Sequence, residues 1–381
     1  MRIAQIAPLA ESVPPKLYGG TERVVSWLTE ELVSLGHEVT LFATGDSVTS
    51  AHLIPVARRA LRLSRPPPDP AIAMAALLEA VADAAPRFDV IHSHLDWVHL
   101  PLLRCLRVPF LTTLHGRLDL PNIELMGQRF PNAPFVSISQ SQRTPAPAMN
   151  WLATIHHGLP LTLLPFTDRP EEYLAFLGRI DPEKGPDVAI RVAHAAGLPL
   201  RIAAKVPRGQ TRYFKETIKP LIEGNGAHFV GEVNDREKQD FLGKALALLF
   251  PINWPEPFGL VMIEAMACGT PVIAWPRGSV PEVIEDGVTG FIVESEADAV
   301  AAIGRARHLD RGRIRETFER RFSARRMAEA YVQSYRALLE SAHSRTSDHL
   351  RTLTSATALR ARQKIGRRQS EPASSRSRAP L

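Results

Sequence analysis

Cysteine is almost absent from this sequence: Cys105 and Cys268 are the only two among 381 residues. They stand far apart, so they provide neither a disulfide framework nor a cysteine metal site, and we expect a reducing, cytoplasmic compartment. No run approaches the roughly 18 apolar residues that a membrane-spanning helix needs. The first 16 residues lack the charged start and long apolar stretch of a secretory signal. We therefore expect neither a disulfide-stapled secreted protein nor a membrane-spanning one.

The basic charge of the chain is confined to one end. The net charge is +6, but nine Lys or Arg and only two acidic residues fall within residues 341–381, and residues 1–340 are close to neutral. A near-neutral body gives no reason to expect a specific nucleic-acid partner. Residues 341–381 lack a sustained apolar face, so we expect a disordered tail. It would be either a passive solubilising extension or a weak electrostatic tether to an anionic membrane.

Short apolar runs alternate with longer periodic ones along the body, as βα units on parallel sheets do. Residues 2–7 predict a strand, and residues 21–35 predict a helix that ends at Gly36. The alternation restarts after residues 157–170, which contain three Pro and one Gly, lack a usable period and predict a hinge. The expected fold class is α/β, with two Rossmann-like domains in series that face a central cleft. Ligands bind at the carboxyl ends of the strands in such sheets, so the cleft is the expected site.

The strongest local signal is a pair of glutamates, Glu256 and Glu264, in the segment P-E-P-F-G-L-V-M-I-E. Glu256 lies in a Pro-bounded loop after a predicted strand, and a helix that begins near Gly259 carries Glu264. Such a pair can accept hydrogen bonds from sugar or ribose hydroxyls, and the free N–H groups of the helix N-terminus can bind phosphate. The alternative is a solvated Glu256 beside an ordinary helix-face Glu264.

Three basic residues follow two neighbouring strands of the second predicted domain. Arg179 and Lys184 flank a turn in the segment L-G-R-I-D-P-E-K-G, and Lys205 follows the next strand. Their side chains can meet at one sheet edge, where Arg binds phosphate through two parallel hydrogen bonds and Lys adds a compact charge. This pattern favours a diphosphate ligand. The alternative is a salt-bridged turn with a surface Lys205.

The first predicted domain offers a glycine loop and a histidine. Gly19 and Gly20 stand between the first strand and the first helix, where they let backbone N–H groups approach an anion. His115 and Gly116 close a predicted strand in T-L-H-G, so the imidazole can bond a substrate hydroxyl or a reacting centre, or can be purely structural. The H-S-H run at residues 92–94 lacks the partners of a zinc site, so we expect no metal there. The sequence has no D-x-D motif, so Arg, Lys and helix N-termini rather than Mg²⁺ would neutralise a diphosphate.

Together these motifs resemble those of the retaining nucleotide-sugar glycosyltransferases of family 4, which have the GT-B fold. The resemblance covers residues 1–340 and rests on Y-G-G-T-E, T-L-H-G, G-R-I-D-P-E-K-G, G-E-V-N-D and the segment with the paired glutamates. It implies that Glu256 contacts the donor sugar and Glu264 the ribose. It also implies that the base lies against Val233 and that His115 faces the reacting sugar. The residues implied to be catalytic are His115 and Glu256, those implied to bind the donor are Arg179, Lys184, Lys205, Val233, Gly259, Leu260 and Glu264, and the phosphate or acceptor loop is Gly19 and Gly20.

The resemblance also divides the chain. It implies an acceptor-binding domain at residues 1–158, a hinge at 159–170, a nucleotide-sugar-binding domain at 171–322 and a helix at 323–340 that crosses back to the first domain. Residues 341–381 remain the basic tail, which the family pattern does not explain.

The activity that the resemblance implies is transfer of a sugar from a UDP-, GDP- or ADP-sugar to an acceptor hydroxyl, with retention of configuration and without a metal or other cofactor. The acceptor would be a carbohydrate, a lipid or a small molecule. One alternative is an isomerase of the same fold, such as a nucleotide-sugar 2-epimerase, which would turn over the nucleotide sugar with no acceptor present. The other is a non-catalytic interaction protein whose tail binds nucleic acid or membrane. The presence of Glu256, Arg179 and Lys184 argues against this second alternative.

Overall fold

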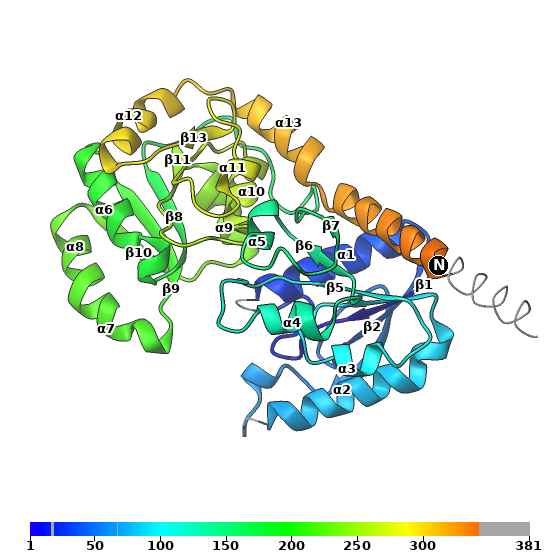
Figure 1. Cartoon of the computed structure of the whole chain (residues 1–381). Coiled ribbons are helices and arrows are strands. Elements are labelled where there is room, and N and C mark those ends of the chain that lie inside the picture. The colour runs from blue at the N-terminus through cyan, green and yellow to red at the C-terminus, as the bar shows by residue number, and fades with distance from the viewer. Residues whose placement is uncertain (17–18, 67, 343–381) are drawn as a thin grey trace, which may run out of the picture. The chain divides into compact units, whose positions relative to one another are not determined.

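The computed structural model describes residues 1–16, 19–66 and 68–342, and it contains two parallel sheets with helices around them (Figure 1). Both sheets lie in one compact unit formed by residues 1–334. Of the rest, residues 335–342 are helical, and the predicted basic tail lies outside the described residues from residue 343 onward. Within the described ranges, every helix is too short or too polar to span a bilayer. The expected α/β class with two Rossmann-like sheets is confirmed.

The N-terminal sheet has seven parallel strands in the order β3-β2-β1-β4-β5-β6-β7. Its central strands are almost wholly buried, as expected of a parallel sheet that is covered on both faces. The strands are β1 (Arg2–Ile6), β2 (Glu38–Thr44), β3 (His52–Ala57), β4 (Val90–Ser93), β5 (Phe110–Thr113), β6 (Phe135–Ser137) and β7 (Trp151–Thr154). The helices are α1 (Gly20–Ser34), α2 (Pro70–Ala84), α3 (Leu100–Leu103), α4 (Glu124–Arg129) and α5 (Gln140–Arg143), with short 3₁₀ turns η1 (Leu61–Leu63) and η2 (Ala85–Arg87).

The C-terminal sheet has six parallel strands in the order β10-β9-β8-β11-β12-β13. The strands are β8 (Leu174–Arg179), β9 (Leu200–Lys205), β10 (Ala227–Gly231), β11 (Ala247–Phe250), β12 (Val272–Ala274) and β13 (Gly290–Ile292). The helices are α6 (Pro186–Ala195), α7 (Thr211–Tyr213), α8 (Lys219–Gly224), α9 (Asp235–Gly243), α10 (Leu260–Ala267), α11 (Val280–Val283), α12 (Glu296–Ala306) and α13 (Arg311–Phe322), with the 3₁₀ turns η3 (Pro182–Lys184) and η4 (Arg208–Gln210) and the π-helical η5 (Phe214–Ile218).

Apolar periodicity explains the long first helix. α1 buries Val24, Val25, Leu28 and Leu32 on one face, which are the residues whose spacing predicts it. Its last residues lead to Gly36, whose φ of 80° lies in the left-handed region that glycine tolerates and that ends a helix. The predicted helix over residues 21–35 is therefore confirmed, to within one residue at each end.

The sequence pattern does not predict three of the strands, and all three lie at sheet edges. β3 is half-exposed along its length and contains Pro55, which an edge strand tolerates because it needs no donor on its free side. β7 is also a partly exposed edge strand, and β13 is an edge strand of only three residues. Their apolar runs are short or, in β3, interrupted by Pro55, so they give only a weak strand signal.

The chain passes twice between the sheets, and the two passages are bonded to each other. Leu159 pairs with Ser323 as a parallel bridge, with Leu159 N–H donating to Phe322 O at 2.9 Å. Residues 324–342 are then helical, and Tyr331 of this helix lies 2.9 Å from Thr113 Oγ1 of β5. The helix therefore returns to the N-terminal sheet, as predicted, whereas the predicted domain and hinge boundaries remain predictions.

Candidate functional site

The three predicted phosphate-binding cations lie at one edge of the C-terminal sheet. Arg179 ends β8 and pairs in register with Lys205, which ends β9. The chain then turns through Asp181, whose side chain caps η3, to Lys184 and Gly185, whose φ is 66°. The Nε atom of Arg179 is buried and has no hydrogen-bond partner within the described part of the chain. Such a donor gains a partner when an anion binds beside it.

Glu256 is a buried carboxylate, 9% exposed, in the loop that follows β11. It forms an ion pair with Lys184 and accepts a hydrogen bond of 3.1 Å from Trp254 Nε1–H. Lys184 Nζ also lies 4.7 Å from the centre of the Trp254 ring, within cation–π range. Glu256 is therefore not a solvated side chain. The salt bridge therefore connects the turn that carries Lys184 with the loop that carries Glu256. These two segments hold the two strongest motifs of the sequence.

Glu264 is also buried and ion-paired, but with a different lysine. It is 4% exposed on α10 and accepts a hydrogen bond of 2.6 Å from Lys238 Nζ of α9. Lys238 lies 3.6 Å from Asp235, which is 2.5 Å from Arg23 of α1. Carboxylate oxygens have several lone pairs, so Glu264 can bind the lysine and still accept hydrogen bonds from ribose hydroxyls. The alternative of an ordinary helix-face glutamate does not describe this buried, paired side chain.

Two helix N-termini lie beside each other near these residues. Gly19 caps α1, which begins at Gly20, and Gly259 with a φ of 78° caps α10, which begins at Leu260. A Cβ atom on Gly20 would lie 3.8 Å from Leu260 Cδ1, so the two helix starts are in van der Waals range. Both starts present free backbone N–H groups, which favours an anion there. The structure thus brings these four sequence-predicted residues together.

His115 follows β5 and belongs to a cluster of histidines. Its Nε2 lies 2.9 Å from His94 Nδ1, and its ring stacks on His157 with a centroid distance of 5.2 Å. His157 in turn contacts the ring of Phe258, two residues beyond Glu256, at 4.9 Å. These contacts connect His115 to the loop that carries Glu256. Burial lowers the pKa of His115 to about 3, so its imidazole is neutral at physiological pH.

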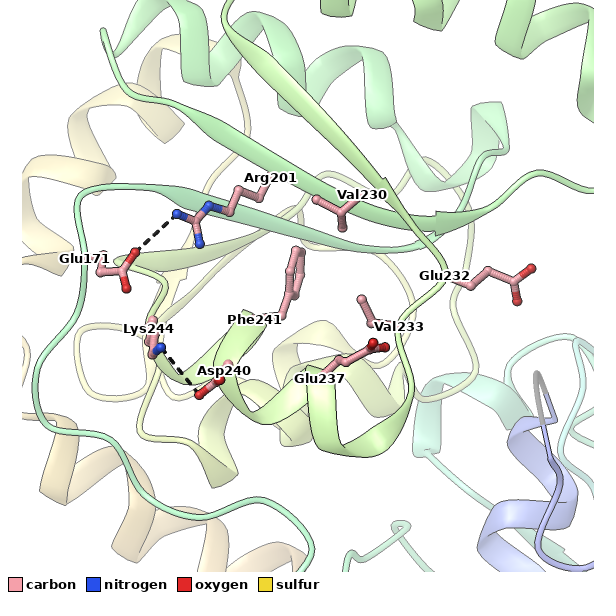
Figure 2. A pocket seen from close by; sticks show the side chains of 9 residues that line it. All are labelled: Glu171, Arg201, Val230, Glu232, Val233, Glu237, Asp240, Phe241 and Lys244. Atoms are coloured by element: carbon pink, nitrogen blue, oxygen red, sulfur yellow. Dashed lines mark hydrogen bonds and ion pairs between the residues drawn. The ribbon is translucent and has the colours of Figure 1, made fainter.

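Val233 lines an open cavity of about 500 Å³ beside the edge strand β10 (Figure 2). Figure 2 shows the side chains of Val230, Val233 and Phe241 around the same space, while the Glu232 carboxylate points away from it. The other residues that line it are Glu171, Arg201, Glu237, Asp240 and Lys244. The cavity therefore has an apolar patch at Val233, the position against which the family resemblance implies a base.

Several residues that hold the site have only weak signals in the sequence. Trp254 lies two positions before Glu256, and an aromatic residue inside a Pro-bounded loop is the signal that could have revealed it. Gln5 is the polar residue in the run Ile3–Ile6 of β1, which is a second signal that the sequence offers, and the structure buries it fully. Lys238 has none, because only the packing of α9 beside α10 brings it to Glu264.

Two family models match the chain in the regions that hold these sites. The model "Glycosyltransferase Family 4" matches residues 18–151, and "Glycosyl transferases group 1" matches residues 166–320. The chain belongs to the family 4 glycosyltransferases of GT-B fold. The match at residues 18–151 includes His115, and the match at residues 166–320 includes Glu256 and Glu264.

The curated relatives are similar in sequence over only part of their length. A D-inositol 3-phosphate glycosyltransferase of Mycolicibacterium gilvum (strain PYR-GCK) is 29% identical over 278 residues, which is 60% of this chain and 60% of that protein. The match therefore spans less than two thirds of that relative.

Two solved structures share the fold over nearly the whole chain. AviGT4, described as a glycosyltransferase involved in avilamycin A biosynthesis, is 24% identical with a TM-score of 0.70, over 89% of this chain and 98% of that one. Anabaena HepE, solved in complex with UDP-glucose, is 18% identical with a TM-score of 0.62, over 90% of this chain and 100% of that one. At these identities the likeness establishes the fold alone.

The buried histidines are expected to make the protein less stable in acid. Burial lowers the pKa of His99 to about 4, as it lowers that of His115 to about 3. In the unfolded chain histidine titrates near 6.5, so below this pH the unfolded state binds more protons than the folded state and is favoured. The free energy of unfolding should fall below about pH 6.5 by up to about 1.4 kcal/mol per pH unit for each such histidine. Thermal unfolding between about pH 7.5 and pH 5 measures the slope.

A matched pair of variants isolates this effect. His99→Gln removes one buried titrating group and should flatten the acid limb, whereas His52→Gln alters an exposed histidine and should leave it as in the wild type. An unchanged slope in His99→Gln would show that the acid limb has another origin.

Proposed function

We propose that this protein transfers a sugar from a nucleoside-diphosphate sugar to an acceptor hydroxyl, with retention of anomeric configuration and without a metal ion. The observation that carries the proposal is the ion pair between Lys184 and Glu256, because it joins the phosphate-side cations to the carboxylate expected to hold the sugar. Family membership supports the reaction class. The retaining outcome and the metal independence are carried over from the family resemblance and the absence of a D-x-D motif.

The proposed reaction puts negative charge on the departing nucleoside diphosphate. Arg179, Lys205 and Lys184 lie where they can stabilise that charge, together with the N-termini of α1 and α10. When the diphosphate binds, Lys184 is expected to exchange part of its contact with Glu256 for a phosphate oxygen. Glu256 then has lone pairs free for sugar hydroxyls, so donor binding and sugar orientation become coupled.

The donor and acceptor follow from the relatives as proposals. HepE was solved with UDP-glucose, so UDP-sugars are the first donors to test, with GDP- and ADP-sugars as comparisons. The M. gilvum relative is named for D-inositol 3-phosphate, so a phosphorylated polyol is the first acceptor to test. Lipid and carbohydrate acceptors complete the panel.

Release of nucleoside diphosphate together with a new glycoside tests the proposal. The full-length protein is incubated with each donor, with and without acceptor, and the anomeric configuration of the product is read by NMR. Retained configuration in an acceptor-dependent product supports the proposal. An inverted product contradicts retention, and conversion of the nucleotide sugar to an epimer without acceptor would assign the protein to the isomerase alternative.

Metal independence is a separate expected result. Because Arg179, Lys184 and Lys205 supply the positive charge, EDTA should leave the rate of transfer essentially unchanged, and added Mg²⁺ or Mn²⁺ should raise it less than about twofold. The rate is measured after dialysis against EDTA, with the dialysed enzyme in plain buffer as control. Loss of activity that only a divalent ion restores would contradict the claim.

We also propose that the basic tail, residues 341–381, tethers the enzyme to anionic membranes. Each basic residue contributes at most about 1 kcal/mol near such a surface, and salt weakens the attraction. Full-length protein should sediment with phosphatidylserine-containing vesicles at low salt and much less at high salt. A truncated protein that ends at Glu340 is the control and should keep the melting temperature and turnover. Equal binding by both proteins would leave the tail a passive extension.

A further inference from the structure

A chain of buried polar side chains runs through the N-terminal sheet and ends at His115. Its centre is Gln5 of β1, which is fully buried. On one side, Gln5 Oε1 lies 2.8 Å from His94 Nε2, and His94 Nδ1 lies 2.9 Å from His115 Nε2. On the other side, Gln5 Nε2 lies 3.4 Å from His92 Nδ1, and His92 Nε2 lies 2.8 Å from Thr113 Oγ1. The side chains come from three neighbouring strands, β1, β4 and β5, and the residues that directly follow them.

The amide of Gln5 gives this chain a direction. A carbonyl oxygen only accepts, so His94 must carry its proton on Nε2 and donate it to Gln5 Oε1. The other nitrogen of a neutral imidazole is then an acceptor, so His94 Nδ1 accepts from His115 Nε2–H. His115 therefore has its proton on Nε2 and a bare lone pair on Nδ1.

The opposite branch is compatible with this orientation of the amide. The Gln5 amide N–H donates to His92 Nδ1, so His92 carries its proton on Nε2 and donates it to Thr113 Oγ1. Thr113 is also bonded to Tyr331 at 2.9 Å, which anchors that end of the chain. Burial holds the pKa values of His92 and His94 well below 6.5, so the chain stays neutral and keeps one tautomer at each ring.

We propose that Gln5, acting through His94, is a positioning residue that holds His115 in the Nε2–H tautomer, so that His115 Nδ1 accepts a hydrogen bond from a hydroxyl of the donor sugar. The Nδ1 atom of His115 is buried and has no hydrogen-bond partner among the described residues, so it is an unpaired acceptor that such a hydroxyl would satisfy. A bare imidazole nitrogen rejects phosphate and carboxylate oxygens, which bring no proton. The hydrogen bonds from Gln5 through His94 thus make His115 Nδ1 a site for a hydroxyl rather than for an anionic group.

The His157 ring lies against the His115 ring in the structure. The two rings stack, and His157 is the first residue of the hinge predicted at residues 157–170. Because Nδ1 is buried, a sugar hydroxyl reaches it only when neighbouring side chains shift, and motion of His157 at the hinge would be one such shift. The tautomer itself does not depend on this motion or on any ligand.

The first test measures the tautomer in the free, full-length protein. Imidazole nitrogens with and without a proton have well-separated ¹⁵N shifts, so ¹⁵N–¹³C spectra of histidine-labelled protein report each ring, and a His115→Asn variant assigns the His115 signals. The wild type should show His115 with a protonated Nε2 and a bare Nδ1. Gln5→Leu and His94→Leu should each give a mixture of the two tautomers at His115. A protonated Nδ1 in the wild type, or an unchanged His115 spectrum in both variants, overturns the proposal.

The matched control is Thr112→Val. It removes the 2.7 Å hydrogen bond between His99 Nε2 and Thr112 Oγ1 in the same buried layer but leaves the hydrogen bonds from Gln5 to His115 intact. It should leave the His115 tautomer unchanged, although it also costs a buried hydrogen bond.

The second part of the proposal, the hydrogen bond from a hydroxyl of the donor sugar to His115 Nδ1, rests on the proposed function. Gln5→Leu should raise the KM for the sugar donor about tenfold with a smaller change in kcat, and Thr112→Val should not. Because the spectra need no donor, a failed transfer assay and a wrong tautomer are distinguishable.

Discussion

Glu256→Ala is expected to lower kcat/KM for the sugar donor by about 30- to 1,000-fold. Glu256 is the buried acceptor that Trp254 and Lys184 hold in place, and in the proposed function its oxygens accept hydrogen bonds from sugar hydroxyls. Each hydrogen bond to a charged group contributes about 1.5–3 kcal/mol, so the loss of one or two such bonds, about 2–4 kcal/mol, gives this range. Steady-state rates with saturating acceptor and varied donor measure the effect.

The comparison variants separate donor binding from loss of the ion pair. Glu256→Ala and Lys184→Ala break the same pair, so both should lower the melting temperature. Only Lys184→Ala should also weaken binding of the free nucleoside diphosphate, because its partner is the phosphate rather than the sugar. Glu223→Ala changes an exposed glutamate of the same domain and should behave as wild type. If Glu256→Ala and Glu264→Ala both transfer sugar at wild-type rates, the site lies elsewhere.

The sequence spacing predicted which residues meet at the sheet edge, because the carboxyl ends of parallel strands always share an edge. Arg179 and Lys205 come together for this reason, since each ends a strand and β8 and β9 are neighbours. The periodicity of α1 predicted its buried face for a similar reason: a helix places residues three and four apart on one side. Local rules of this kind predict which residues end a strand and which face of a helix is buried, because a single βα unit determines both.

The partners of the charged residues could not be predicted in this way. Glu264 is bonded to Lys238, and only the packing of α9 against α10 decides that contact. The pairing of Lys184 with Glu256 joins two turns that are 72 residues apart. The direction of the Gln5 chain depends on how one amide is oriented among three strands. These properties arise from tertiary packing, which leaves no periodic trace in the sequence.

Gly278→Ala is expected to lower kcat/KM about 100-fold although it changes a residue that carries no functional group. Gly278 follows β12 with a φ of 58°, and a Cβ atom on it would lie 2.2 Å from Glu256 O and 2.3 Å from Glu256 N. Backbone atoms cannot rotate away as a side chain can, so the Glu256 loop must move by about 1 Å. A displacement of that size in a positioned group can cost about 100-fold in rate.

Gly287→Ala is the matched control for the backbone conformation. Gly287 has a φ of 72°, in the same left-handed region, but no atom lies within 4 Å of the Cβ that alanine would add. Both substitutions therefore carry the strain of alanine at positive φ, about 1 kcal/mol, and only Gly278→Ala pushes on the Glu256 backbone. Melting temperatures and donor kinetics of the two variants are compared side by side. We expect both to lose some stability and only Gly278→Ala to lose activity. Equal activity in the two variants would show that the close approach of Gly278 to Glu256 does not position the carboxylate.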